Sequence, residues 1–483
     1  MEDPAALRWL PRSPQDFRAR CAEVDKRPGR GDALRQLAGH ALGVNELQRL
    51  ARSVDQALAD GAAAPLQEFT LGLVSNTTTD FIAPALIGSA ARHGMALRVA
   101  AATFGMTMQA ALDLTSEPLA SRPHAILLAL DYRAYFADYA VEGDPEARVT
   151  AAIRQLQDLV AAFSDASRAV LLVQTIAAPP ERLFGSFDRG QPGTGAWLAA
   201  AFNQRLSSEV LRPGVSLLDV EALANQVGLA SWFDRSQYMT ARLPFASRFV
   251  PIYAEHVARL IGAIRGRSRK VLVLDLDNTL WHGVIGDDGI DGIHLGQGDP
   301  RGEAHQDLQR AALALKQRGI LLAISSKNDE AVARQAIREH PEMLLREADF
   351  SAMQINWSDK ATNLEVLADR LSLGIDSFVF LDDNPAERAQ VRASLPEVLV
   401  PELPSDPAEY AAVLMASGAF EAVSFSEEDR QRAEQYAANA RRDSLAAQSR
   451  DLAGFLASLQ MRIFFTADGD TGWSRFTQLI NKS

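Results

Sequence analysis

Short, mainly apolar runs alternate with longer helix-like stretches along most of this chain. Such runs are typical of strands buried on both faces of a parallel sheet, and the stretches between them supply the crossovers that parallel strands need. The pattern therefore predicts an α/β fold with two Rossmann-like parallel-sheet domains. The predicted strands lie at residues 71–76, 97–101, 124–130, 169–174 and 215–219 in the first domain, and at 271–274, 321–324 and 378–381 in the second.

The sequence around these runs suggests the domain boundaries. Residues 1–65 are rich in Ala and Arg and predict a helical segment interrupted by prolines. The first α/β domain is expected over residues 66–266, up to a basic linker, and the second over residues 267–404. Residues 405–483 predict a helical linker followed by a short, incomplete α+β segment.

Candidate chemistry begins where the strand at residues 271–274 ends. Asp275 and Asp277 follow this strand directly. Residues two apart in an extended segment point the same way, so both carboxylates can face one site, where a hard divalent cation would offset their repulsion. A carboxylate in this position can attack a phosphoryl group, and its neighbour can act as acid and base. Taken alone, the segment is equally typical of a turn.

Three later segments supply the other groups that such a site needs. Ser325 and Ser326 end one strand and offer hydroxyls to a phosphoryl oxygen. Lys360 offers a cation that stabilises negative charge. Asp382 and Asp383 end another strand and can complete a Mg²⁺ coordination sphere. The alternative for each residue is a solvated or turn position, but the four segments support one another.

This order of motifs resembles the haloacid dehalogenase (HAD) superfamily of phosphotransferases. The resemblance implies that Asp275 is the nucleophile and Asp277 the general acid and base. It also implies that Ser326 binds phosphate and that Lys360 orients it. Asp382, with Asp383 beside it, would be the main magnesium ligand, and the predicted metal site consists of Asp275, Asp277, Asp382 and Asp383.

The flanking residues are similar to the FkbH-like subgroup, also called HAD-IIIC phosphatases. The matching text covers residues 275–289, 326–329, 340–343, 356–357 and 382–388. The resemblance implies a role in polyketide-type secondary metabolism. The enzyme would take 1,3-bisphosphoglycerate, a phosphorylated three-carbon metabolite, remove phosphate, and load a glyceryl unit onto the phosphopantetheine thiol of an acyl carrier protein. Similar text after residue 426 opens an acetyltransferase-like domain in this subgroup, and here the sequence ends within it.

One position departs from the FkbH-like pattern. Members usually carry a cysteine that accepts the acyl group, but this chain has Ser325 there. A hydroxyl is a poorer nucleophile than a thiol and needs a nearby base. Ser325 would hold the acyl group as an ester, or the carrier thiol would attack the acyl phosphate directly, or the protein would be a phosphatase of a small metabolite without acyl transfer. Lys327 and Asn328 are further candidates for substrate contact.

The first α/β domain is similar to SGNH hydrolases at one position. Ser75 ends its first predicted strand, where those enzymes carry their nucleophile. The block that should supply their Asp and His has only Asp234 and no histidine nearby. Without a base Ser75 is not activated, so we expect a non-catalytic domain in which Ser75 and Asn76 are turn residues.

Composition fits a cytoplasmic protein. The single cysteine, Cys21, excludes an intramolecular disulfide and predicts a buried thiol without a catalytic role. Membrane association is not expected, because no stretch has the apolar length of a membrane span and no secretion signal is apparent. The net charge of −12 argues against nucleic-acid binding. It also argues that an acidic carrier protein would need a local basic patch, for which residues 265–270 and 441–442 are candidates.

Overall fold

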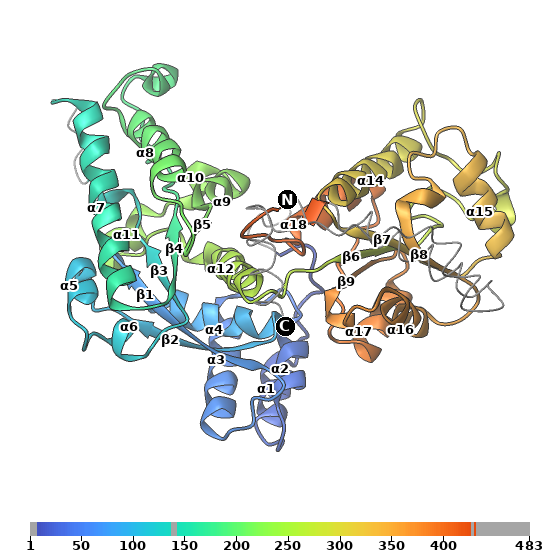
Figure 1. Ribbon diagram of the computed structural model, residues 1–483, viewed down its shortest axis with the longest axis horizontal. Coiled ribbons are helices and arrows are strands. Elements are labelled where there is room, and N and C mark those ends of the chain that lie inside the picture. Colours follow the sequence, from blue (N-terminus) through green and yellow to red (C-terminus); the bar gives the residue numbers. More distant parts are fainter. Residues whose placement is uncertain (1–6, 137–142, 427–428, 431–483) are drawn as a thin grey trace, which may run out of the picture.

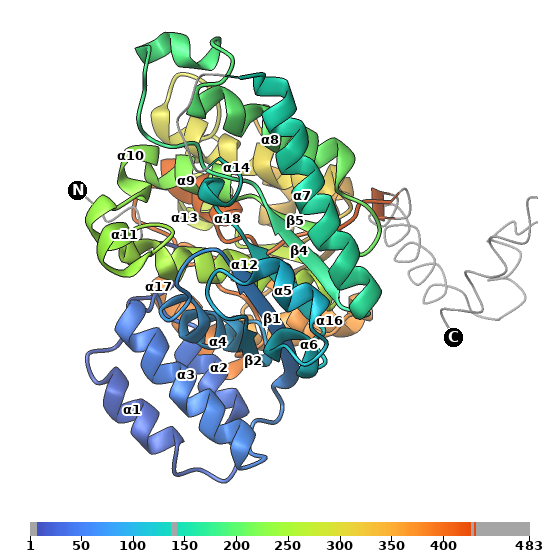
Figure 2. The same cartoon turned by 90° about the vertical axis from the view of Figure 1, so that its left-hand side faces the viewer.

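The computed structural model describes residues 7–136, 143–426 and 429–430. Two parallel sheets, each flanked by helices, lie side by side, and a group of N-terminal helices packs beside both (Figures 1 and 2). Both sheets are parallel, so the predicted fold class is confirmed. The expected C-terminal α+β segment lies outside the described residues, as do positions 441–442. No helix in the described part of the chain is long and apolar enough to cross a bilayer.

The N-terminal segment, for which the sequence predicts helices, contains three of them among its described residues. They are α1 (Phe17–Val24), α2 (Gly31–Ala38) and α3 (Val44–Ala59). The apolar side chains of α3, including Leu47 and Val54, are fully covered. They belong to the same apolar cluster as Leu73 of the first sheet, so these helices are part of the globular body.

The first sheet has the strand order β2-β1-β3-β4-β5. Its strands are β1 (Gln67–Ser75), β2 (Met95–Ala101), β3 (Ala125–Ala129), β4 (Val170–Gln174) and β5 (Val215–Leu218). All five coincide with the predicted apolar runs. Alternate residues of β3 enter different cores, because Leu127 belongs to one apolar cluster and Leu128 to another.

Helices cover both faces of this sheet. On one face α4 (Ile82–Arg92) and α12 (Val250–Ile264) pack together, and on the other α7 (Pro145–Ala166) and α8 (Gly195–Glu209) do so. The shorter helices are α5 (Thr107–Leu112), α6 (Glu117–Ala120), α9 (Val220–Val227), α10 (Leu229–Trp232) and α11 (Arg235–Ala241).

The second sheet has the order β8-β7-β6-β9. Its strands are β6 (Val271–Leu274), β7 (Leu321–Ser326), β8 (Phe350–Ile355) and β9 (Phe378–Leu381). From β6 the chain continues to β7 and β8 on one side, and it then crosses to the other side of β6 to form β9. A crevice therefore opens between the carboxyl ends of β6 and β9, which is where open α/β sheets bind their ligands.

Helices cover this sheet as well. Leu274 faces α14 (Pro300–Gln317) and α15 (Glu330–Glu339), whereas Val273 faces α16 (Lys360–Leu371) and α17 (Pro385–Ser394). The remaining helices are α13 (Ile285–Asp288), in the glycine-rich loop after β6, and α18 (Tyr410–Ala416), which packs on α14. Since Leu274 and Leu73 share one apolar cluster, the two sheets are joined by a continuous core.

Candidate functional site

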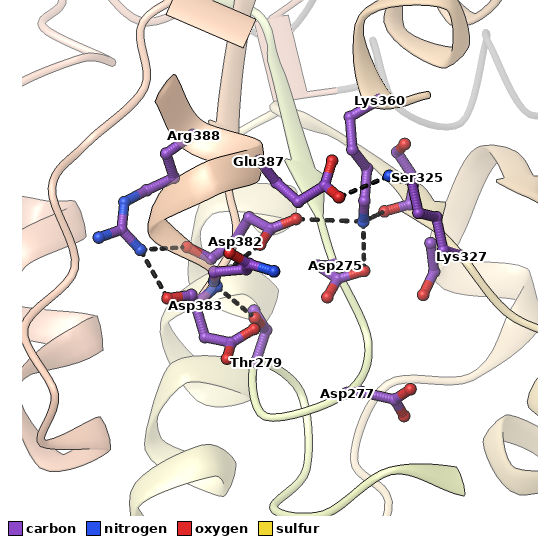
Figure 3. A network of polar contacts seen from close by, with 12 residues as sticks. Asp275, Asp277, Thr279, Ser325, Lys327, Lys360, Asp382, Asp383, Glu387 and Arg388 are labelled. Atoms are coloured by element: carbon purple, nitrogen blue, oxygen red, sulfur yellow. Dashed lines mark hydrogen bonds and ion pairs between the residues drawn. The ribbon is translucent and has the colours of Figure 1, made fainter. Parts of the chain in front are cut away.

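Three carboxylates meet in the crevice between β6 and β9. Asp275 follows β6, and Asp382 and Asp383 follow β9. The backbone N–H of Asp275 donates to the carbonyl of Leu381 over 2.9 Å, so strand pairing continues up to the acidic residues. One carboxylate oxygen from each of the three residues lies within 4.8 Å of the other two. Figure 3 shows the three side chains converging from two strand ends.

Lys360 carries the positive charge at this site. It is the first residue of α16, and the side chain of Asp359 caps the helix by accepting from the N–H of Thr362. Its Nζ atom donates to Asp275 Oδ1 over 2.5 Å and to the carbonyl of Ser325 over 2.7 Å, and it lies 3.1 Å from Asp382 Oδ2. Burial lowers the pKa of this lysine, but the two carboxylates outweigh burial and raise it. Lys360 is therefore a fixed cation.

The acidic pair after β9 is short of compensating charge. Burial is the main cause that raises the pKa of Asp382, and the charge of Asp275 adds to it. The same two causes raise the pKa of Asp383 to about 6. One lysine thus faces three carboxylates. Oxygen ligands in this excess of negative charge are suited to a hard divalent cation, so the donor set fits Mg²⁺.

Arg388 holds the backbone of the acidic pair, a role that its place in the sequence motif did not reveal. The guanidinium is 3% exposed. Its Nη1 donates to the carbonyls of Asp382 and Asp383 over 2.8 and 2.7 Å, and its Nη2 donates to Glu402 Oε1 over 2.6 Å. The N–H of Asp383 in turn donates to Thr279 Oγ1 over 3.2 Å. These contacts fix the direction of both carboxylates.

Asp277 lies beside this group and is held by different partners. Its Oδ1 accepts from the indole N–H of Trp281 over 2.9 Å and from the N–H of Ile285 over 3.0 Å, and its Oδ2 accepts from Asn328 over 2.9 Å. Burial nevertheless raises its pKa, although the hydrogen bonds oppose the shift. Its carboxylate is not among the three grouped oxygens, and Figure 3 shows it apart from them. Its expected role as a metal ligand stays a prediction.

Of the residues at and just after the end of β7, some contact residues of the acidic site and others contact residues beside it. Ser326 is buried, and its Oγ accepts from Asn328 over 3.1 Å. The Oγ of Ser325 is buried too and has no hydrogen-bond partner among the described residues, whereas its carbonyl accepts from Lys360. Lys327 forms an ion pair with Glu387, with 2.5 Å between Nζ and Oε1. Because Asn328 donates to both Ser326 and Asp277, it links these two side chains.

Ser75 lies at the corresponding crevice of the first sheet, in a structural role. Its Oγ donates to the carbonyl of Ala129 over 3.0 Å, accepts from the N–H of Thr77 over 3.0 Å, and lies 2.9 Å from Thr77 Oγ1. The small pocket around it is lined by side chains such as Gln174 and Tyr253, and none of the described residues that line it is a histidine. A hydroxyl used in this way is not activated. The non-catalytic character of this domain stays a prediction.

Asn76 and Cys21, two further residues of the sequence analysis, have clear surroundings in the structure. Asn76 bonds Asp131 across the crevice, with 2.8 Å between Nδ2 and Oδ1, which ties the end of β1 to the end of β3. Cys21 is fully buried on α1, and burial is the main cause that raises the pKa of its thiol. A buried thiol with a raised pKa is a weak nucleophile.

Comparisons with known proteins agree with this architecture. Residues 70–262 match the family model described as the FkbH N-terminal domain. The structure is similar, with a TM-score of 0.71 and 28% identity, to the crystal structure of the N-terminal part of a Bacteroides fragilis protein that contains a phosphatase domain, complexed with Mg. The similarity covers 80% of this chain and all of that chain. No curated protein matches. The resemblance to the FkbH-like subgroup, stated from the motifs, is confirmed.

Proposed function

From the FkbH-like architecture of this chain, we propose that it is a Mg²⁺-dependent phosphatase of the HAD type with Asp275 as its nucleophile. The observation that carries the proposal is the contact of Lys360 with both Asp275 and Asp382, next to Asp383. A buried cation bonded to a carboxylate at a strand end is the arrangement that aspartyl phosphate chemistry requires. The Mg complex of the similar Bacteroides fragilis structure supports the choice of metal.

The chemistry assigns one task to each group. Asp275 Oδ attacks phosphorus, and the bond from phosphorus to the leaving oxygen breaks as Asp277 gives that oxygen a proton. Asp277 then takes a proton from water, which attacks the aspartyl phosphate, and the bond between phosphorus and Asp275 breaks to release phosphate. Lys360 and the hydroxyl of Ser326 stabilise the phosphoryl oxygens. A Mg²⁺ ion held by Asp275, Asp382 and Asp383 would supply further neutralisation of phosphoryl charge.

Asp277 has the properties of the proton carrier in this scheme. Its pKa is raised, so the protonated form is more accessible than for an ordinary aspartate. Its three hydrogen bonds hold the carboxylate in one orientation, and Asn328 connects it to the side of Ser326 where phosphate would lie. It also lies outside the carboxylate group that would bind metal, so metal binding and proton transfer do not compete for the same oxygens.

The activity test compares three proteins with Mg²⁺ and a panel of phosphorylated three-carbon metabolites. The wild type should release phosphate, and Asp275→Asn should release none above background, because an amide is not a nucleophile at phosphorus. Asp307→Asn, an exposed aspartate on α14, is the matched control and should keep full activity. Turnover by Asp275→Asn at the wild-type rate would remove this residue from the mechanism.

A second proposal concerns the fate of the carbon chain. The match to the FkbH N-terminal domain favours glyceryl loading from 1,3-bisphosphoglycerate onto an acyl carrier protein, since a plain phosphatase does not need that domain. The buried Oγ of Ser325 disfavours a seryl ester. We therefore favour direct attack of the carrier thiolate on the acyl carbon. The new bond is the C–S thioester, the C–O bond to the C1 phosphate breaks, and this phosphate leaves. The C3 phosphate ester remains, and its removal through Asp275 and Asp277, with water as the second reactant, leaves the glyceryl unit.

Intact-mass spectrometry distinguishes the two proposals. The protein is incubated with Mg²⁺, enzymatically regenerated 1,3-bisphosphoglycerate and a holo carrier protein, and both proteins are weighed. A glyceryl mass shift on the carrier supports loading. Release of phosphate with no shift on either protein supports a phosphatase without acyl transfer.

A further inference from the structure

A large cleft lies between the N-terminal helices and the second α/β domain, away from the acidic site. Its volume is about 890 Å³, within the range of roughly 300–1,000 Å³ that is usual for small-molecule sites. Residues of α1 and α2 line one side of it, and residues of α17 and of the segment after it line the other. The apolar residues that line the cleft include Leu37 and Val398.

The cleft is basic although the chain carries a net charge of −12. Six arginines line it, against only two carboxylates, those of Asp16 and Glu23. The arginines are Arg20, Arg27, Arg35, Arg92, Arg269 and Arg392. Charges of one sign in a concave, partly apolar site focus the electrostatic potential and attract counter-ions.

Three of these arginines already have carboxylate partners. Arg20 pairs with Asp16, Arg92 with the buried Glu255, and Arg392 with Glu402. The other three differ. Arg269 donates to the backbone carbonyls of Asp376 and Glu397, so no carboxylate is bonded to it, although the charges of these two residues act on it.

The side chains of the exposed Arg27 and of Arg35 complete the group of arginines without a bonded carboxylate. No hydrogen bond or ion pair of either side chain is found in the described part of the chain. Burial is the main cause that lowers the pKa of Arg35; the charge of Glu397 opposes the shift, Arg267 adds to it, and Asp376 and Asp32 oppose it. A partly buried guanidinium that has no bonded anion can bind one.

Two guanidinium groups share a small space beside this cluster. Gly94 has φ +73°, and a Cβ atom placed there would lie 2.5 Å from Arg267 Nη1 and 4.0 Å from Arg35 Cζ. Like charges this close repel. Burial and the charge of Arg35 lower the pKa of Arg269 to about 10. An anion between these groups would relieve the repulsion.

We propose that this cleft binds an organic diphosphate, with its phosphates on Arg27, Arg35 and Arg269 and its apolar part on Leu37 and Val398. Guanidinium forks match phosphate oxygens with paired hydrogen bonds, and two phosphates suit three cations that have no bonded carboxylate. The volume and concave shape favour a small molecule over the helix of an acidic protein.

The cleft is distinct from the phosphatase site. Helix α17 begins at Pro385, beside the acidic pair, and Arg392 lies near its other end. At 1.5 Å per residue these positions are about 10 Å apart along the helix axis, so the cleft opens at the opposite end of the strands. The proposal therefore does not rest on the proposed function.

Inorganic pyrophosphate is the probe, measured by isothermal titration calorimetry in EDTA at low salt. The double variant Arg27→Gln/Arg35→Gln should weaken the dissociation constant at least about tenfold, a change equivalent to 1.4 kcal/mol. Arg52→Gln, an exposed arginine on α3 outside the cleft, should bind as the wild type does. Equal melting temperatures of the variants show that folding is unaffected.

Ser326→Ala tests whether the probe occupies the catalytic crevice. Unchanged binding by this variant supports the cleft, whereas binding lost in Ser326→Ala and kept in the double variant overturns the proposal. Absence of pyrophosphate binding to the wild type overturns it as well. So does binding of an acidic carrier protein that depends on Arg27 and Arg35 while pyrophosphate does not bind, because the surface would then serve a protein partner.

Discussion

The ammonium group of Lys360 lies 2.5 Å from Oδ1 of Asp275, so the proposed nucleophile is bonded to a buried cation before any substrate arrives. The same nitrogen lies 3.1 Å from Asp382. One side chain thus connects the ends of β6 and β9. The contact holds the carboxylate of Asp275 in one orientation at the end of β6.

Replacing Lys360 by Met should lower kcat about 10²–10³-fold at saturating Mg²⁺, the usual cost of losing one stabilising charge or donor at a transition state. Phosphate release by the purified, folded variant is the measurement. Lys316→Met is the control, because Lys316 forms an ion pair with Asp349 outside the site. A Lys360→Met enzyme with wild-type kcat would show that this charge does not act on the phosphoryl group.

Asp277→Asn should lower kcat about 10²–10⁴-fold, the range for loss of a general acid and base. The amide keeps the size of the side chain and can still accept from Trp281 and Ile285, so folding should be little affected. The effect should be smaller for substrates with good leaving groups, which need less protonation. Equal losses for good and poor leaving groups would argue that Asp277 has a different role.

Much of this site could be predicted from the sequence, because its residues follow strands with clearly apolar sequences. The apolar runs before Asp275, Ser326 and Asp382 predict buried parallel strands. Parallel strands bring their carboxyl ends to one edge of the sheet. Lys360 lies at a helix start, where a short motif marked it.

The parts that could not be predicted depend on tertiary packing. Arg388 reads as an ordinary charge on a helix, and only the folded chain turns it toward the carbonyls of Asp382 and Asp383. The two-residue spacing predicts that the carboxylates of Asp275 and Asp277 point the same way. The chain leaves the strand after Leu274, however, so the alternation of an extended segment no longer governs its direction. The basic cleft joins residues more than 300 positions apart, such as Arg27 and Arg392, which no local pattern connects.

Arg388→Lys should weaken Mg²⁺ binding about 10–100-fold, the usual effect of losing a residue that orients metal ligands. A lysine keeps the charge but cannot hold both carbonyls and Glu402 at once. Titration of activity with Mg²⁺ is the measurement, and kcat should recover at high Mg²⁺. Arg392→Lys is the matched control, since Arg392 also bonds Glu402 but not the two carbonyls. Equal effects of the two substitutions would assign Arg388 a merely structural role.

Asp383→Asn should change how the stability of the metal-free protein depends on pH. The pKa of Asp383 is about 6 in the folded protein and 3.8 as the ordinary value, so the folded state holds the proton to a higher pH. Its contribution to stability is present below about pH 4 and is lost as pH rises to 6. In EDTA the variant should therefore exceed the wild type in unfolding free energy by about 1–3 kcal/mol at pH 7.5 and by less at pH 5.

Thermal or denaturant unfolding at the two pH values tests this expectation, and Asp307→Asn again serves as the control. Mg²⁺ should raise the stability of the wild type at pH 7.5 more than that of Asp383→Asn, because the ion replaces the missing proton. A variant less stable than the wild type at pH 7.5 without metal would contradict the assigned charge imbalance.

Ser325→Ala should leave phosphate release and any glyceryl loading intact. The Oγ atom is buried and has no hydrogen-bond partner among the described residues, so its loss removes an unsatisfied group and should stabilise the protein or leave it unchanged, by up to about 1 kcal/mol. The contact of its carbonyl with Lys360 does not depend on the side chain. Melting temperature, phosphate release and intact mass of the carrier are the measurements. Loss of loading with phosphate release preserved would instead favour a seryl ester. Ser325→Cys separates these cases further: a glyceryl mass shift that appears on the enzyme only in this variant would show that the position can receive the acyl group when it carries a thiol.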